Sequence, residues 1–362
     1  MEVIEFLKQP HLVAKIQKFF GVTVQSQNEF NIRNKFWYYF FIFGTALGDE
    51  TFYTFFIPFW FWNIDGAVGR RVVLVWSLVM YIGQSIKDII RWERPGFPVV
   101  KLQSKWAMEY GMPSTHAMVA ISIPFSVLLY TMDRYQYCVG IGTVIAITWC
   151  LLVCVSRLYL GMHTVLDVVA GIFLTIALML PLIPLIDQLD NYFLTNSTSP
   201  ILVLVVSILL IVYYPNSDKW TPTRGDTTMV VSVCVGLLIG SWLNFQTGRM
   251  ATPELRPPYT ILWPSLTMVG YLFLRTFIGF ACVVITKQFA ISLSYNFLCT
   301  LLRQNVDVLR KSENSLHNKH KNFVDLVCKF VTCALIGFNT IYVIPHIFRL
   351  FRIERPTFYT EV

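Results

Sequence analysis

Ionisable side chains gather in one stretch of an otherwise apolar chain, between Lys87 and Asp167. They form three clusters of fixed spacing: K-x6-R-P from Lys87, P-S-T-H ending at His116, and S-R-x5-H-x3-D ending at Asp167. Such groups cost free energy within a membrane and usually mark a functional site. Together they predict a cage of cations that binds an oxyanion, with a histidine that attacks it.

The first cluster ends an apolar run. Lys87, Arg91 and Arg94 are spaced i, i+4 and i+7, which predicts that they share one helical face. Pro95 is expected to stop that helix. Three cations on one face need an anion or an acid among them, although side chains that snorkel to the membrane surface would give the same pattern.

The second cluster opens a helix. Ser114 has the form of an N-cap before the apolar run 117–130, and the free N–H groups of a helix N-terminus suit a phosphate. His116 then falls in the first turn, beside the bound anion. A capping serine near a histidine is also common by chance, so this cluster indicates a phosphate site only in combination with the other two.

The third cluster spans a helix end and the next helix start. Ser156 and Arg157 close one helix, Gly161 allows a tight turn, and His163 and Asp167 follow at i and i+4. This spacing predicts a hydrogen bond from Asp167 to one imidazole nitrogen, which leaves the other nitrogen free to attack. A purely structural histidine–aspartate pair is the alternative.

The elements that must position these clusters are membrane helices. Hydrophobic residues make up 55% of the 362-residue chain and charged residues 14%. Because a spanning helix needs roughly 20 apolar residues, we expect an all-α, polytopic membrane helix bundle with about eight to ten transmembrane helices. The candidate runs are 36–62, 71–91, 115–132, 137–157, 166–187, 200–214, 228–245, 262–286 and 325–348. If 71–91 and the three runs after it each cross once, all three clusters meet at one membrane surface.

Three regions are expected along the chain. Residues 1–35 alternate apolar and basic positions, which fits an amphipathic interfacial segment or a solvated helix that packs on the protein. Residues 36–189 form the membrane core that carries the three clusters, and 190–362 add further transmembrane helices. The acids Asp49 and Glu50 interrupt the first run, so that run either lines a polar cavity or forms a hairpin of two half-helices. No basic start precedes a long apolar core, so no cleavable signal peptide is expected.

Charge and cysteine usage narrow the class of protein. The formal net charge of +8 is spread over short loops and helix ends, which favours membrane lipids or an anionic substrate over nucleic acid. The eight cysteines form no CxxC pair and fall mostly in apolar runs, so we expect small core residues rather than metal ligands. The basic loop from Arg303 to Lys321 also lacks the partners that a metal site needs.

The three clusters resemble the signature of the type 2 phosphatidic acid phosphatase superfamily at every motif position. Longer stretches, including 87–92, 109–117, 156–163 and 223–227, resemble the sphingosine-1-phosphate phosphatases within it. The resemblance implies a metal-independent lipid phosphate phosphatase without a cofactor, with a membrane phosphatase core of six-helix type over residues 36–189. It also implies that His163 forms a phosphohistidine, that Asp167 orients it and that His116 protonates the leaving alkoxide. The residues expected to hold the phosphate are Lys87, Arg94, Ser114, Thr115, Ser156 and Arg157.

The same resemblance implies sphingosine-1-phosphate and related sphingoid-base phosphates as substrates, in the endoplasmic reticulum membrane with the site facing the lumen. Arg224, Asp226, Asp49 and Glu50 are further candidate contacts for the substrate. A broader lipid phosphate phosphatase and a glucose-6-phosphatase-like enzyme are alternatives within the superfamily. A membrane transporter or scaffold that binds an anion without turning it over is the alternative outside it. Oligomeric state, chain-length preference and the route of the substrate do not follow from the sequence.

Overall fold

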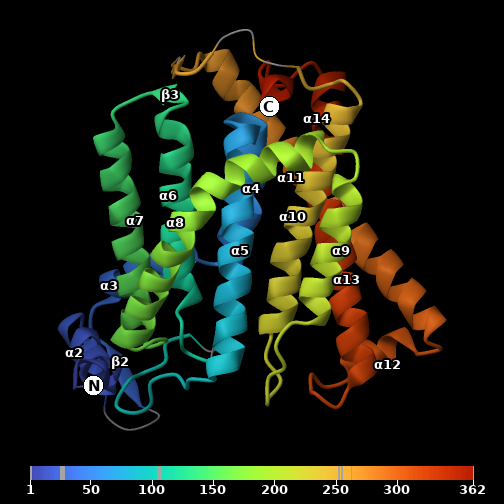
Figure 1. Ribbon diagram of the computed structural model, residues 1–362. Helices are drawn as coiled ribbons and strands as arrows, with labels where there is room; N and C mark the ends of the chain where they lie inside the picture. The colour runs from blue at the N-terminus through green and yellow to red at the C-terminus, as the bar shows by residue number, and fades with distance from the viewer. Residues whose placement is uncertain are drawn as a thin grey trace.

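A computed structural model describes residues 2–24, 29–103, 108–251, 253, 256–261 and 263–361, and it is almost entirely helical (Figure 1). Seven helices of this described part are long and apolar enough to cross a membrane: α5 (Gly66–Ile90), α6 (Thr115–Met132), α7 (Val139–Tyr159), α8 (Val165–Thr195), α10 (Thr223–Gln246), α11 (Leu266–Leu301) and the pair α13 (Lys319–Ile341) and α14 (Val343–Leu350). The shorter apolar helix α9 (Ser199–Val212) joins α8 to α10. The chain is therefore a multi-pass helical membrane protein.

The motif-bearing ends of four helices lie together at the lower end of the bundle in Figure 1. Helix α5 runs down and α6 runs up, and α7 and α8 repeat that pattern. The C-terminal end of α5, the start of α6, the end of α7 and the start of α8 thus lie at one end of the bundle. This is the arrangement that the crossing order of the apolar runs predicts.

The run predicted over 36–62 is two helices, α3 (Lys35–Ala46) and α4 (Glu50–Asn63), which meet at residues 47–49. Asp49 has extended backbone angles at the N-cap of α4. The Tyr53 hydroxyl donates to the Leu47 carbonyl over 2.9 Å and braces the junction. Backbone groups freed at such a break need partners inside a membrane, so the break is expected where it lines a polar site.

The N-terminal segment comprises α1 (Glu2–Lys8), α2 (Pro10–Phe19) and a short antiparallel pair, β1 (Val22–Val24) with β2 (Phe30–Ile32). One face of α2 packs on the core: Val13 is buried, and the Gln17 amide donates to the carbonyls of Val100 and Tyr159, both over 2.8 Å. Phe19 on the same helix is exposed. Contact of the exposed face with a membrane surface stays a prediction.

The far end of the bundle is held by buried ion pairs. Asp65 caps α5 through the amides of Ala67 and Val68 and accepts a bond from Arg134 over 2.6 Å. Arg70 of α5 pairs with Asp190 of α8 over 2.8 Å. A short parallel pair, β3 (Tyr135–Gln136) with β4 (Tyr259–Thr260), and the small helix α12 (Val306–Lys311) complete the connections.

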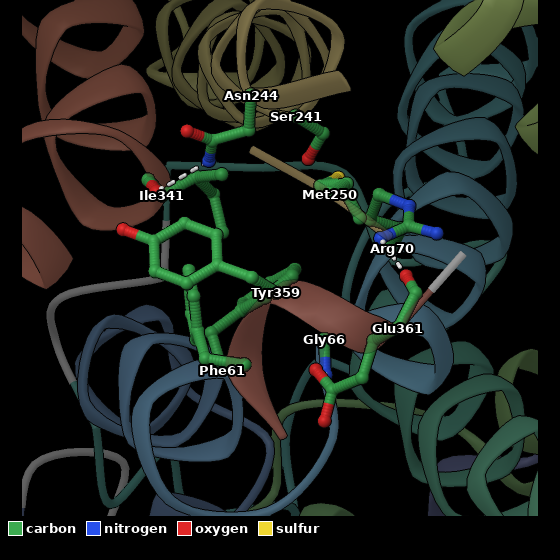
Figure 2. Close-up of a pocket in the computed structure, with 10 residues that line it drawn as sticks. Phe61, Gly66, Arg70, Ser241, Asn244, Met250, Ile341, Tyr359 and Glu361 are labelled. Carbon is green, nitrogen blue, oxygen red and sulfur yellow. Dashed lines mark hydrogen bonds between the residues drawn. The ribbon is translucent and has the colours of Figure 1, made fainter. Parts of the chain in front are cut away.

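The C-terminal tail, with the 3-10 helix Phe358–Thr360, closes this far end. Figure 2 shows the small pocket there, where the Glu361 carbonyl accepts a bond from Arg70 over 3.0 Å. The Glu361 carboxylate also accepts the Gly66 amide. The residues lining this pocket include none of the three motifs, so it belongs to the support of the fold.

Candidate active site

The first cluster contributes two buried cations to the site, not three. Helix α5 ends at Ile90, and Arg91 takes a left-handed conformation with φ of 57°. The Arg91 side chain donates to the carbonyls of Asp88 and Asn216 and lies partly in solvent. The prediction that Lys87, Arg91 and Arg94 share a helical face is therefore wrong, because the chain leaves the helix before Pro95 and turns Arg94 back over the site.

Lys87 and Arg94 converge on the same acid. The Lys87 ammonium lies 2.9 Å from Glu109 Oε2 and donates to the Thr115 hydroxyl over 3.1 Å. Arg94 donates to the main-chain carbonyls of Glu109, over 3.0 Å, and Met162, over 2.6 Å. The hydrogen bonds to these carbonyls orient the guanidinium of Arg94. Lys87 and Arg94 are thus placed so that one anion could contact both.

Glu109 is a site residue that the sequence reasoning did not single out. Burial acts to raise the pKa of its carboxyl, but the charges of Lys87 and Arg94 outweigh that effect and hold the pKa below its usual value. The group is thus a carboxylate at neutral pH. The sequence feature that could have identified Glu109 is its position, four residues before Pro113 in a stretch otherwise rich in cations.

The second cluster forms a helix N-terminus as predicted. Ser114 is the N-cap of α6, and its hydroxyl faces the Ala117 amide at 3.5 Å. His116 lies in the first turn, and its Nε2 is 2.8 Å from the Asp49 carboxylate. A Cβ on Gly48 would stand 3.0 Å from the His116 ring, so the break between α3 and α4 packs closely on this histidine.

Arg157 is the most deeply buried cation of the site, with no exposed surface. Its Nη1 donates to the Thr45 hydroxyl of α3 over 2.8 Å and to the Gln103 amide oxygen over 2.9 Å. Its Nε and Nη2 have no hydrogen-bond partner within the described ranges. Ser156, by contrast, donates its hydroxyl to the Val153 carbonyl of its own helix over 2.6 Å.

His163 lies in the turn between α7 and α8, where Gly161 has φ of +68° and a Cβ would collide with the Val100 carbonyl. Its Nδ1 is 2.9 Å from the Gly111 carbonyl, which can only accept, so Nδ1 carries the proton. Its Nε2 is 3.4 Å from Arg94 Nη1. The nitrogen that carries the lone pair therefore faces Arg94, on the cationic side of the site.

Asp167 differs from the prediction in its partner. Its Oδ2 is 3.9 Å from His163 Nδ1, beyond hydrogen-bond distance, and accepts the Thr164 amide over 2.7 Å. The Thr164 hydroxyl accepts the Asp167 amide in return, so the two residues form a capping box for α8. A carbonyl 52 residues upstream in the chain, on Gly111, holds the tautomer that the spacing had assigned to Asp167.

Electrostatics keep His163 neutral. Burial lowers the pKa of its imidazole well below the usual value, and the positive charges of Arg94, Arg157 and Lys87 act in the same direction. A neutral imidazole has the lone pair that a nucleophile needs. The site thus combines an uncharged imidazole with three cations that would stabilise the charge of a bound oxyanion.

The remaining candidate contacts have partners near the same end of the bundle. Arg224, in the first turn of α10, donates to the Ile211 carbonyl over 3.0 Å, and Asp226 lies 3.5 Å from the Lys329 ammonium of α13. Glu50, the first residue of α4, is close enough for its charge to act on Asp226. No described contact joins Arg224 or Asp226 to the motif residues, so their contact with a substrate stays a prediction.

The residues that the structure describes contain no group of three or more histidine, cysteine, aspartate or glutamate side chains that could hold a metal ion. Of the acids near the cage, Glu109 pairs with Lys87, Asp49 with His116, and Asp167 caps the start of α8. A helical membrane bundle with a histidine in a cage of cations defines a class of phosphatase, and residues 69–189 match the model of the PAP2 superfamily.

Comparison with known proteins narrows this class. The chain is 40% identical over 361 residues to sphingosine-1-phosphate phosphatase 2 of Mus musculus, which covers 96% of this chain and 98% of the relative. It is 38% identical over 313 residues to sphingosine-1-phosphate phosphatase 1 of Rattus norvegicus, covering 86% and 71%. It is 28% identical to lipid phosphate phosphatase delta of Arabidopsis thaliana, covering 65% and 58%. The chain therefore belongs to the sphingosine-1-phosphate phosphatase family. No solved structure gives a significant match.

Proposed function

We propose that the protein hydrolyses sphingosine-1-phosphate and related sphingoid-base phosphates through a phosphohistidine intermediate, without a metal ion. The observation that carries this proposal is the orientation of His163, with Nδ1 on the Gly111 carbonyl and Nε2 toward Arg94. The names of the relatives support the substrate class.

In the first step, His163 Nε2 attacks phosphorus and the bond from phosphorus to the ester oxygen breaks. Lys87, Arg94 and Arg157, with the amides at the start of α6, hold the phosphate oxygens while charge builds up on them. Nε and Nη2 of Arg157, which have no partner among the residues that the structure describes, fit this task. His116 gives its proton to the leaving alkoxide, so a neutral alcohol departs.

In the second step, water attacks phosphorus and the phosphorus–nitrogen bond breaks. His116, now without the proton that it gave away, accepts one from the water, and His163 recovers its lone pair. Inorganic phosphate is released, and the enzyme returns to its starting state. Asp167 supports this cycle through the helix start that carries His163. We place the site on the lumenal side of the endoplasmic reticulum membrane, as the family resemblance implies.

Phosphate release by purified protein tests the proposal. The panel comprises sphingosine-1-phosphate, phosphatidic acid and glucose-6-phosphate, each with and without a chelator, alongside His163→Ala. We expect the sphingoid phosphate to be preferred, the chelator to have no effect, and His163→Ala to be inactive. Brief incubation with phosphorus-labelled substrate should leave acid-labile label on the wild-type protein alone. Release that survives His163→Ala would overturn the proposed mechanism.

A further inference from the structure

A carboxylate stands among the cations that would bind phosphate. Glu109 Oε2 is 2.9 Å from the Lys87 ammonium and 3.7 Å from Arg94 Nη2. The side chain is 4% exposed. An acid at this place weakens the attraction of the cage for a bare phosphate, because it neutralises part of the positive charge and repels the phosphate oxygens.

The second oxygen of the Glu109 carboxylate, Oε1, accepts no hydrogen bond from the residues that the structure describes. This oxygen is also buried. A buried carboxylate oxygen without a donor is costly, and a ligand that brings a donor removes that cost. Phosphate as a dianion offers acceptors only, so the donor must come from another part of the ligand.

The proposed substrate has such a donor in the right place. A sphingoid-base phosphate carries an ammonium group on the carbon next to the phosphate-bearing carbon, three bonds from the ester oxygen. A phosphate held by Lys87 and Arg94 therefore brings that ammonium close to the acid that both cations contact. A charged donor paired with a carboxylate makes a stronger hydrogen bond than a neutral hydroxyl does.

Resting on the proposed function, we propose that Glu109 Oε1 accepts a hydrogen bond from the ammonium group of the substrate. This contact makes Glu109 the residue that distinguishes sphingoid-base phosphates from lipid phosphates without a positive charge beside the phosphate. The two carboxylate oxygens of Glu109 thus have different roles: Oε2 orients Lys87, and Oε1 binds the substrate ammonium.

The test compares Glu109→Gln with the wild type on three substrates. Sphingosine-1-phosphate carries the ammonium, lysophosphatidic acid carries a hydroxyl at the equivalent carbon, and ceramide-1-phosphate carries an amide there. We expect Glu109→Gln to lower kcat/KM for sphingosine-1-phosphate at least tenfold more than for the other two, mainly through KM. Asp187→Asn is the matched control, because Asp187 pairs with Arg71 at the far end and its side chain is 56% exposed.

The outcomes separate the two roles of Glu109. An equal loss on all three substrates would make it a positioning residue for Lys87 and overturn the amine contact. If Glu109→Gln does not fold, Glu109→Asp replaces it, and a preference for sphingosine-1-phosphate equal to that of the wild type at unchanged KM counts against the contact. A wild type that turns over lysophosphatidic acid but not sphingosine-1-phosphate refutes the proposed substrate, and the amine contact with it. A wild type that prefers sphingosine-1-phosphate, with a preference unchanged by Glu109→Gln, refutes the contact alone.

Discussion

His116 Nε2 and Asp49 Oδ1 lie 2.8 Å apart, although 67 residues separate them in the chain. Asp49 belongs to the break between α3 and α4, outside the three motifs. A carboxylate in this position accepts a hydrogen bond from the imidazole and fixes the ring in the orientation that a general acid needs. The proton donor of the proposed reaction therefore has a support of its own.

The first prediction concerns this support. Asp49→Asn keeps the shape of the side chain but removes its charge, so protonation of the leaving group should slow. General acid–base catalysis contributes roughly 10²–10⁴-fold, and we expect about a tenfold to hundredfold loss of kcat on an alkyl phosphate. On p-nitrophenyl phosphate, whose leaving group needs no proton, the loss should be small. Equal losses on both substrates would mean that Asp49 does not act through His116.

The second prediction concerns the protonation of His163. Burial and the neighbouring cations lower the pKa of this imidazole, so the neutral form persists as the pH falls through 6.5, the usual value. Nitrogen NMR of histidine-labelled protein at pH 6 should show His163 as a neutral ring protonated at Nδ1, assigned by loss of its signal in His163→Ala. An imidazolium signal for His163 at pH 6 would contradict this assignment.

The third prediction uses the close approach of Gly48. A Cβ there would lie 3.0 Å from His116 Cδ2 and 3.2 Å from Val153 Cγ1, so Gly48→Ala should displace the histidine. Overpacking of this kind costs about 1–3 kcal/mol, yet activity should fall more than thermal stability because the proton donor moves. Gly270→Ala is the control, since no atom from another part of the described chain lies within 4 Å of a Cβ at that position. Full activity in Gly48→Ala would count against tight packing of His116.

The fourth prediction concerns orientation in the membrane. Asn196 follows the end of α8, at the opposite end of the bundle from His163 (Figure 1). If the site faces the lumen, Asn196 is cytoplasmic and carries no glycan, so endoglycosidase treatment should leave the mass unchanged. Asp218→Thr creates a sequon at Asn216 in the loop at the site end and should permit a glycan there. A mass shift that disappears in Asn196→Gln would place the site on the cytoplasmic side.

Local patterns predicted the helices and the motif ends well. Apolar runs and proline or serine signals located both ends of α6 and α7 and the start of α8 to within two residues, because capping and burial depend on nearby residues. Helix α8 continues past the predicted end at residue 187 to Thr195. Pro95 was expected to stop α5, but that helix ends at Ile90. Its C-cap, Arg91, takes a left-handed conformation that glycine usually adopts, so the sequence carries no signal for this end.

Contacts across the bundle could not be predicted in this way. The partners of His163 at Gly111, of His116 at Asp49 and of Arg157 at Thr45 come from other elements. The i, i+4 spacing favoured Asp167 as the partner of His163, but the helix start needed that carboxylate as a cap. Tertiary packing decided which acceptor the imidazole took.

Thr45 and Asp49, which hold Arg157 and His116, lie before residue 69, where the match to the superfamily model begins. Two supports of the candidate site thus lie on a segment outside the matched region, whereas Gly111, the partner of His163, lies within it. Substitutions in the broken run 36–62 can change the surroundings of His116 and Arg157 while every motif residue stays the same. Two enzymes with identical motifs can therefore differ widely in turnover, and motif matching alone does not measure that difference.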